Sequence, residues 1–317
     1  MPPVVFVHGI AQEQLGPATL GQQWRTALSD GVWKSGAPAV AERLLRVPGQ
    51  AGAVNTQMVF YADLFDPVDV QGGAANVAQL DVDEAALLEQ LAEALLRRAA
   101  EGAGSAGDQQ MARDELAWLS GSVGEEQGVR NAARSALAAL ARLRWFAPFG
   151  MAVAQRFVAR SLMQVTRYLT DPGLRTAVQE RVAEQLGPDT QVVIGHSLGS
   201  VVAYEAVCRP GPAVPLLITL GSPLGLRSVI YDRLRPQPPR FPERVIRWVN
   251  VSAEDDVVAA VPDLTTLFAA TKPALARFEG GVVVENGTAP HAATHYLTKR
   301  EVGRPVADVL GDAAADL

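Results

Sequence analysis

Short apolar runs rich in β-branched residues alternate with longer segments of mixed polarity along much of the chain. Six such runs predict strands, at residues 4–7, 58–61, 192–194, 215–220, 245–251 and 282–285. Helices are expected between them, over residues 21–31, 171–186, 200–207, 264–269 and 302–310. Strands that alternate with helices are typical of a mostly parallel sheet covered on both faces, so we expect an α/β fold.

The alternation is interrupted between residues 80 and 170, where β-branched runs are few and Ala, Leu, Arg and Glu predominate. An amphipathic helix is indicated over residues 84–100 by an apolar face made of Leu87, Leu88, Leu91 and Leu95. Further helices are expected over residues 108–119, 129–145 and 151–169. We therefore interpret residues 80–170 as a helical cap inserted into a single α/β domain that spans residues 1–317.

The second half of the cap is locally basic. Residues 127–170 contain no Asp or Glu but seven arginines, at positions 130, 134, 142, 144, 156, 160 and 167. An uncharged, aromatic-rich segment, residues 145–149, lies among them. Two interpretations remain open. The cap contacts an anionic membrane surface or an anionic substrate, or its arginines pair with carboxylates elsewhere, notably in residues 84–126.

Composition narrows the class of protein. The 317-residue chain is 48% hydrophobic with a mean hydropathy of +0.09, which is ample for a core and argues against a disordered chain. Its net charge of −6 gives no reason to expect nucleic-acid binding. Cys208 is the only cysteine, so no intramolecular disulfide can form. No uncharged apolar run reaches ~18 residues and no secretory signal is visible, so we expect a cytoplasmic protein without a membrane-spanning helix.

The segment Gly195-His196-Ser197-Leu198-Gly199 stands between a predicted strand and a predicted helix. Glycines two residues before and two residues after a serine permit a turn too sharp for side chains at those positions. Such a turn lifts the serine hydroxyl clear of the backbone and directs the next N–H groups toward the atom that it attacks. We therefore predict that Ser197 is a nucleophile.

A serine hydroxyl needs a general base near neutral pH, and the chain has four histidines. His196 lies inside the turn with its side chain directed away from the hydroxyl, so we interpret it as a packing or hydrogen-bonding residue, and His8 ends the first strand. His291 and His295 follow the last predicted strand, which agrees with the chain order Ser, acid, His. Spacing does not decide between them. We prefer His291, which lies in the polar part of the segment beside Pro290, and keep His295 as the alternative.

The acid that orients the base is expected after a strand that lies between the serine and the histidines. Residues 247–258 have this form: a strand and a turn lead to Glu254, Asp255 and Asp256, and an apolar pair follows. Ligand chemistry gathers at the carboxyl ends of parallel strands, where this cluster stands. We select Asp256, directly before the apolar pair, as the acid and keep Asp255 as the alternative.

The oxyanion that forms when a nucleophile attacks a carbonyl needs two N–H donors. The geometry of the serine turn makes the Leu198 amide one of them. The second donor is expected from the segment His8-Gly9-Ile10 after the first strand. Gly9 lets the chain turn beneath the substrate, which makes the Ile10 amide the expected donor.

Five segments together resemble the α/β-hydrolase superfamily, of the lipase and esterase kind. They are VFVHGI at 5–10, GHSLGS at 195–200, TLGSPLG at 219–225, WVNVSAEDDVV at 248–258 and HAATHYL at 291–297. Within the superfamily the chain is most similar to lipase-like groups related to GPI-inositol deacylases. The resemblance covers residues 1–65 and 188–310 but not the cap. It implies that residues 221–224 shape the pocket floor near the serine, and a plain strand-ending turn is the alternative.

The chain also departs from that superfamily. It begins at the oxyanion strand, without the two antiparallel strands that commonly come first. Its acid segment reads Asp-Asp-Val-Val where many relatives have a single Asp followed by Pro, which keeps the choice of acid open.

These residues predict a serine hydrolase that cleaves a carboxylic ester, such as a lipid or acyl ester, through an acyl-enzyme. A thioesterase, an amidase or a peptidase would use the same residues, and a non-catalytic binding module on the same fold is an interpretation from another class. The histidines lack the glutamate of an HExxH zinc motif, and no phosphate-binding glycine loop is present. We therefore expect no cofactor and no metal, and an ester as the partner rather than nucleic acid.

Overall fold

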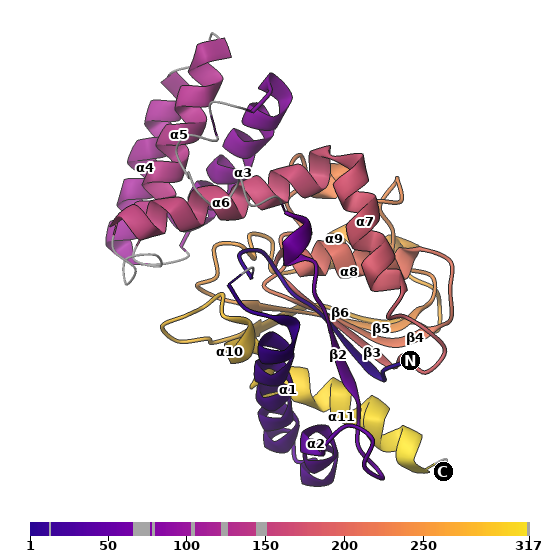
Figure 1. The fold of residues 1–317 in the computed structure, drawn as a ribbon. Helices are drawn as coiled ribbons and strands as arrows, with labels where there is room; N and C mark the ends of the chain where they lie inside the picture. The colour runs from indigo at the N-terminus through magenta and orange to yellow at the C-terminus, as the bar shows by residue number, and fades with distance from the viewer. Residues whose placement is uncertain are drawn as a thin grey trace.

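Six parallel strands form a single sheet at the centre of the protein (Figure 1). The structure is a computed structural model that describes residues 1–12, 14–65, 77, 80–102, 105–121, 126–143 and 151–315. The strands are β1 (Val4–Val7), β2 (Thr56–Val59), β3 (Val192–His196), β4 (Val214–Leu220), β5 (Val245–Ala253) and β6 (Arg277–Val284). Their order is β2-β1-β3-β4-β5-β6, and every neighbouring pair is parallel. The predicted α/β fold is confirmed.

Helices cover both faces of the sheet (Figure 1). One face carries α1 (Pro17–Lys34), α2 (Pro38–Leu45) and α11 (Arg300–Ala315). The other carries α7 (Pro172–Ala183), α8 (Leu198–Cys208) and α9 (Thr265–Phe268), and α10 (Ala293–Leu297) lies beyond the end of β6. Short 3-10 helices are found at Ala62–Leu64, Tyr231–Arg233 and Ala269–Thr271.

The alternation of side chains along each strand divides the core between these two layers. On β1, Val4 and Phe6 pack into the cluster beneath α1, α2 and α11, whereas Val5 and Val7 pack into the cluster with α7 and α8. All four are fully buried, which is why the central strands read as continuous apolar runs.

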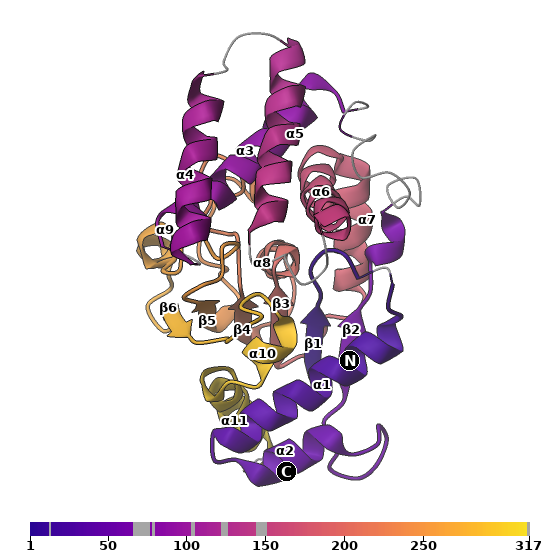
Figure 2. The same cartoon turned by 90° about the vertical axis from the view of Figure 1, so that its left-hand side faces the viewer.

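Four helices form the cap between β2 and β3: α3 (Val82–Ala100), α4 (Ala106–Gly121), α5 (Glu126–Arg142) and α6 (Met151–Thr170). The helices α3, α4 and α5 lie side by side, while α6 runs from them toward α7 (Figures 1 and 2). A capping box starts α3, in which Asp81 accepts from the Glu84 amide and Glu84 accepts from the Asp81 amide. The cap has an apolar cluster of its own, and Val257, which follows β5, packs into it.

The arginines of the cap have mixed surroundings. Arg142 forms an ion pair with Glu115 at 3.4 Å, and Arg130 donates to the Leu80 carbonyl oxygen at 2.9 Å. The first of these contacts is of the kind expected if the arginines pair with carboxylates in residues 84–126. Arg144 and the aromatic segment 145–149 lie outside the described residues. Within the described ranges, no helix is long and apolar enough to cross a bilayer.

Candidate active site

The segments that the sequence selected for chemistry all follow the carboxyl ends of strands. Segment 8–10 follows β1, Ser197 follows β3, Asp256 follows β5 by a short turn, and His291 follows β6. Because the sheet is entirely parallel, these ends meet at one edge.

Ser197 occupies a sharp turn between β3 and α8. Its φ of 55° and ψ of −129° lie in a region that L residues rarely adopt, and its amide donates to the Leu220 carbonyl oxygen at 3.0 Å. A Cβ on Gly195 would collide with the Gly199 backbone, and one on Gly199 would collide with the carbonyls that end β1. The two glycines therefore let three backbone segments meet, and the serine takes the strained position.

Asp256 and His291 form a hydrogen-bonded pair. The His291 Nδ1 lies 2.8 Å from Asp256 Oδ2, and the Asp256 side chain has no exposed surface. The same Oδ2 accepts from the Tyr296 hydroxyl at 2.7 Å, while Oδ1 accepts from the Val258 amide at 2.9 Å. Nδ1 carries the proton that it donates to the carboxylate, so Nε2 is the nitrogen available to act as a base.

Asp255 and His295, the alternatives that the sequence left open, are not part of this pair. Asp255 is exposed, in contrast to the buried Asp256. His295 is also exposed; it lies on α10, not in a loop as expected, and its Nδ1 bonds the Asn286 carbonyl oxygen at 2.9 Å. The structure thus brings together the first choices of the sequence analysis, Asp256 and His291.

The surroundings of Asp256 keep its carboxylate charged. Burial alone would raise its pKa, but the positive charge that His291 carries when protonated and hydrogen bonds from His291, Tyr296 and the Val258 amide together lower the pKa below its usual value. For Tyr296, burial first and the nearby Asp256 second raise the pKa far above its ordinary value, so it remains a donor. Its hydroxyl also accepts from the Ala253 amide at 2.7 Å. Tyr296 thereby joins the end of β5 to Asp256.

His196 links the serine turn to the histidine segment. Its Nε2 lies 2.7 Å from the His291 carbonyl oxygen, and the two rings are 4.5 Å apart. Burial, with the charge of His291 second, lowers the pKa of His196 to about 3, so the ring is neutral and Nε2 is its donor. The expectation of a hydrogen-bonding role for His196 agrees with this contact. The bond ties the backbone of His291 to the residue that precedes Ser197.

His8 holds the segment that we name the oxyanion loop, residues 8–11. Its Nε2 accepts from the Tyr61 amide at 3.1 Å, so Nδ1 donates to the Gly9 carbonyl oxygen at 2.6 Å. Burial lowers the pKa of His8 to about 4, and its ring stacks on Tyr61 with centroids 4.1 Å apart. A Cβ on Gly9 would lie 2.8 Å from the Ser197 Cβ, so the loop rests directly against the serine.

The two predicted N–H donors, Leu198 and Ile10, are the chain neighbours of Ser197 and Gly9. Leu198 is the first residue of α8, and the first amides of a helix have no partner within it. Ile10 is half-buried in the oxyanion loop, and its carbonyl oxygen accepts from the Gln12 side chain at 3.0 Å. Leu198 directly follows Ser197 in the chain, and Ile10 directly follows Gly9, which packs against Ser197.

The resemblance placed residues 221–224 near the serine, but sequence reasoning did not identify the contacts that Gly221 and Tyr296 make with the Asp256–His291 pair. Gly221 has a φ of 51°, and a Cβ there would lie 2.7 Å from Asp256 Oδ2 and 3.0 Å from His291 Nδ1. The first residue of the segment 221–224 thus packs against the Asp256–His291 pair. Its position directly after β4, at the edge where the other site residues gather, is the signal that could have indicated this contact.

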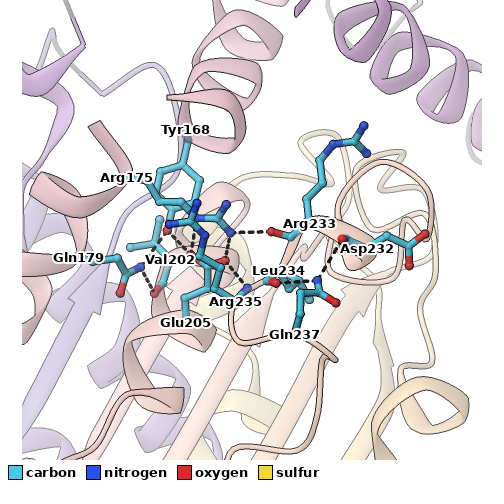
Figure 3. A network of polar contacts seen from close by, with 10 residues as sticks. All are labelled: Tyr168, Arg175, Gln179, Val202, Glu205, Asp232, Arg233, Leu234, Arg235 and Gln237. Atoms are coloured by element: carbon cyan, nitrogen blue, oxygen red, sulfur yellow. Dashed lines mark hydrogen bonds and ion pairs between the residues drawn. The ribbon is translucent and has the colours of Figure 1, made fainter. Parts of the chain in front are cut away.

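A buried network supports α8, the helix that follows Ser197 (Figure 3). On α8, the Glu205 carboxylate accepts from the Tyr168 hydroxyl at 2.7 Å, from the Arg235 amide at 2.9 Å and from Arg175 through two nitrogens. Gln179 donates to the Tyr168 hydroxyl at 2.8 Å. Arg175 and Glu205 are both almost fully buried, so α6, α7 and α8 are joined through a desolvated ion pair.

The two buried neutral histidines predict an acid-dependent loss of stability. Both have folded-state pKa values lowered to about 4 and about 3, against roughly 6.5 in an unfolded chain. The unfolded chain therefore binds more protons below pH 6.5, so their contribution is fully present above that pH and is lost as the pH falls toward 4. The slope approaches about 1.4 kcal/mol per pH unit for each histidine.

Urea unfolding at a series of pH values between 5 and 8 measures this slope. His196→Gln is expected to lower this slope by about 1.4 kcal/mol per pH unit, which corresponds to one proton. A slope that is the same in wild type and His196→Gln would contradict the prediction.

Among the described residues, no group of three or more His, Cys, Asp or Glu side chains is placed to hold a metal ion. Comparison of the chain with protein-family models, with curated proteins and with solved structures gave no match.

Proposed function

We propose that the protein is a serine hydrolase that cleaves a carboxylic ester, such as a lipid or acyl ester, through an acyl-enzyme. The observation that carries the proposal is the strained Ser197 directly after β3, whose neighbour His196 is hydrogen-bonded to the backbone of His291, the partner of the buried Asp256. Backbone strain of this kind costs on the order of 1–3 kcal/mol and is characteristic of functional sites.

In the proposed reaction, the Ser197 hydroxyl attacks the acyl carbon while His291 Nε2 takes its proton. The resulting imidazolium is stabilised by the negative charge of Asp256, which stays ionised because its pKa is lowered. The carbonyl oxygen becomes an oxyanion that accepts from the Ile10 and Leu198 amides. His291 then protonates the departing alkoxide, which leaves the acyl group on Ser197.

Water completes the cycle. His291 takes a proton from a water molecule as the water attacks the acyl-enzyme, and it returns that proton to Ser197 as the carboxylic acid leaves. Tyr296 and the Val258 amide hold Asp256 in place throughout, since both donate to its oxygens. Protons and electron pairs balance without a cofactor.

A fluorophosphonate probe tests the proposal, because it reacts with an activated serine and not with an ordinary hydroxyl. We expect wild-type protein to hydrolyse p-nitrophenyl butyrate and to gain one phosphonyl group, located by peptide mass spectrometry on Ser197. The Ser197→Ala variant should gain none. Ser200 lies three residues after Ser197 and donates to the Gly195 carbonyl oxygen, so it is the internal control for nonspecific labelling. Equal labelling of wild type and Ser197→Ala would refute the proposal.

A further inference from the structure

A polar side chain of the cap bonds the oxyanion loop. The side chain of Gln164, on α6, accepts from the Ala11 amide through its Oε1 at 2.8 Å. Gln164 is 2% exposed and Ala11 is half-buried, so the acceptor side of the bond is shielded from water. Ala11 is bonded directly to Ile10, the expected oxyanion donor.

The backbone of the loop needs this support. Ala11 has a φ of 57°, one of two positive values at non-glycine residues within the described parts of the chain, the other being Ser197. A side chain in this region is unfavourable, and such a conformation persists only when the surroundings fix it. The loop is held on its other side by His8, which bonds Gly9, and by Gln12, which bonds Ile10.

Gln164 lies where α6 passes from the cap to the body of the protein. Leu162 and Met163, just before it, belong to the apolar cluster of the cap, and Val165 and Tyr168, just after it, belong to the cluster of the sheet. Tyr168 is anchored to Glu205 by the buried network. The position of the Gln164 amide is therefore set by both cores, and a shift of α6 would move the acceptor of the Ala11 amide.

We propose that Gln164 is a positioning residue for the oxyanion loop. By holding the Ala11 amide in the positive-φ conformation, it aims the neighbouring Ile10 amide at the oxyanion. The cap thereby takes part in the chemical step and not only in substrate choice. This inference rests on the proposed hydrolase function.

Gln164→Met tests the inference because it keeps the length of the side chain and removes the acceptor. A displaced donor weakens the transition state more than the bound ester, so kcat for p-nitrophenyl butyrate should fall about 10- to 100-fold with KM changed less than about threefold. Gln164→Glu, which restores an oxygen acceptor, should recover most of that loss. Exchange of the Ala11 amide hydrogen should be faster in Gln164→Met than in wild type.

Thr166→Val is the matched control. Thr166 is fully buried on the same helix, and its hydroxyl makes no hydrogen bond within the described structure. Its kcat should equal that of wild type, which separates the loss of one contact from a general disturbance of α6. Should Gln164→Met fail to fold, Gln164→Asn, which withdraws the acceptor by one methylene, gives the same measurement.

The outcomes separate the two proposals. If Ser197→Ala is inactive while Gln164→Met keeps wild-type kcat, the positioning role is overturned and the hydrolase proposal stands. An equal loss of kcat in Thr166→Val would also overturn the positioning role. If wild-type protein neither hydrolyses the ester nor reacts with the phosphonate at Ser197, both proposals fall.

Discussion

Replacing His291 by alanine is expected to lower kcat for p-nitrophenyl butyrate by about 10⁴- to 10⁶-fold, with little change in KM. The imidazole is assigned to take the proton of Ser197, and without it the hydroxyl stays a weak nucleophile. Because serine and base act as one unit, Ser197→Ala and the double variant should lose about the same factor as His291→Ala, not the product of two factors. Steady-state kinetics of the four proteins measure this directly.

The second histidine of the same segment is the control. His295 is exposed and bonds the Asn286 carbonyl oxygen, so His295→Ala should keep kcat within about twofold of wild type. Reversed results, with His295→Ala inactive and His291→Ala active, would show that the Asp256–His291 pair is not the catalytic one. Circular dichroism and thermal unfolding of both variants exclude loss of the fold as the cause.

Replacing Glu205 by glutamine is expected to lower the free energy of unfolding by about 3–5 kcal/mol, because Arg175 would keep a buried charge without its counter-ion. The Arg175 guanidinium lies against Glu205 and over the Tyr168 ring, 5.3 Å from its centroid, with little access to water (Figure 3). Burial opposes its charge, but the contacts with Glu205 outweigh burial and raise its pKa. Urea unfolding followed by circular dichroism measures the change.

Two further variants identify the cause of that loss. Glu93 pairs with Arg97 at 2.6 Å on the exposed face of α3, and Glu93→Gln should cost no more than about 0.5 kcal/mol. Removing both buried charges, in Arg175→Met with Glu205→Leu, should recover a large part of the stability lost in Glu205→Gln. A Glu205→Gln protein within about 1 kcal/mol of wild type would show that the buried pair contributes little.

The sequence was most informative where one face or both faces of an element are buried. The central strands appear as uninterrupted apolar runs, and their predicted positions agree closely with β1, β3, β4 and β5. The start of β6 was missed because this edge strand has few buried apolar positions there. Arg277 and Glu279 are exposed, and the pair Gly280-Gly281 is not typical of a strand. The helices α2 and α10 were missed because eight and five residues are too few to show a helical period.

For the candidate site, the residue types were predictable but their partners were not. The order of serine, acid and histidine follows from the chain, yet the choice between His291 and His295 depends on the turn that starts α10. The Tyr296 hydroxyl reaches Asp256 across 40 residues of sequence, a contact that no local pattern encodes. The Gln164 contact with Ala11 spans 153 residues and joins the cap to the first loop of the chain.

Because α6 packs into both the cap cluster and the sheet cluster, it limits where a chimera of this protein can be joined. β2 is an edge strand, so a foreign lid grafted between β2 and β3 would leave the hydrogen-bonded ladder intact. A graft that also exchanged the second half of α6 would remove Gln164 and Tyr168, and with them the supports of Ala11 and Glu205. The junction of such a graft therefore belongs on the cap side of Leu162, with the rest of the helix kept as part of the recipient.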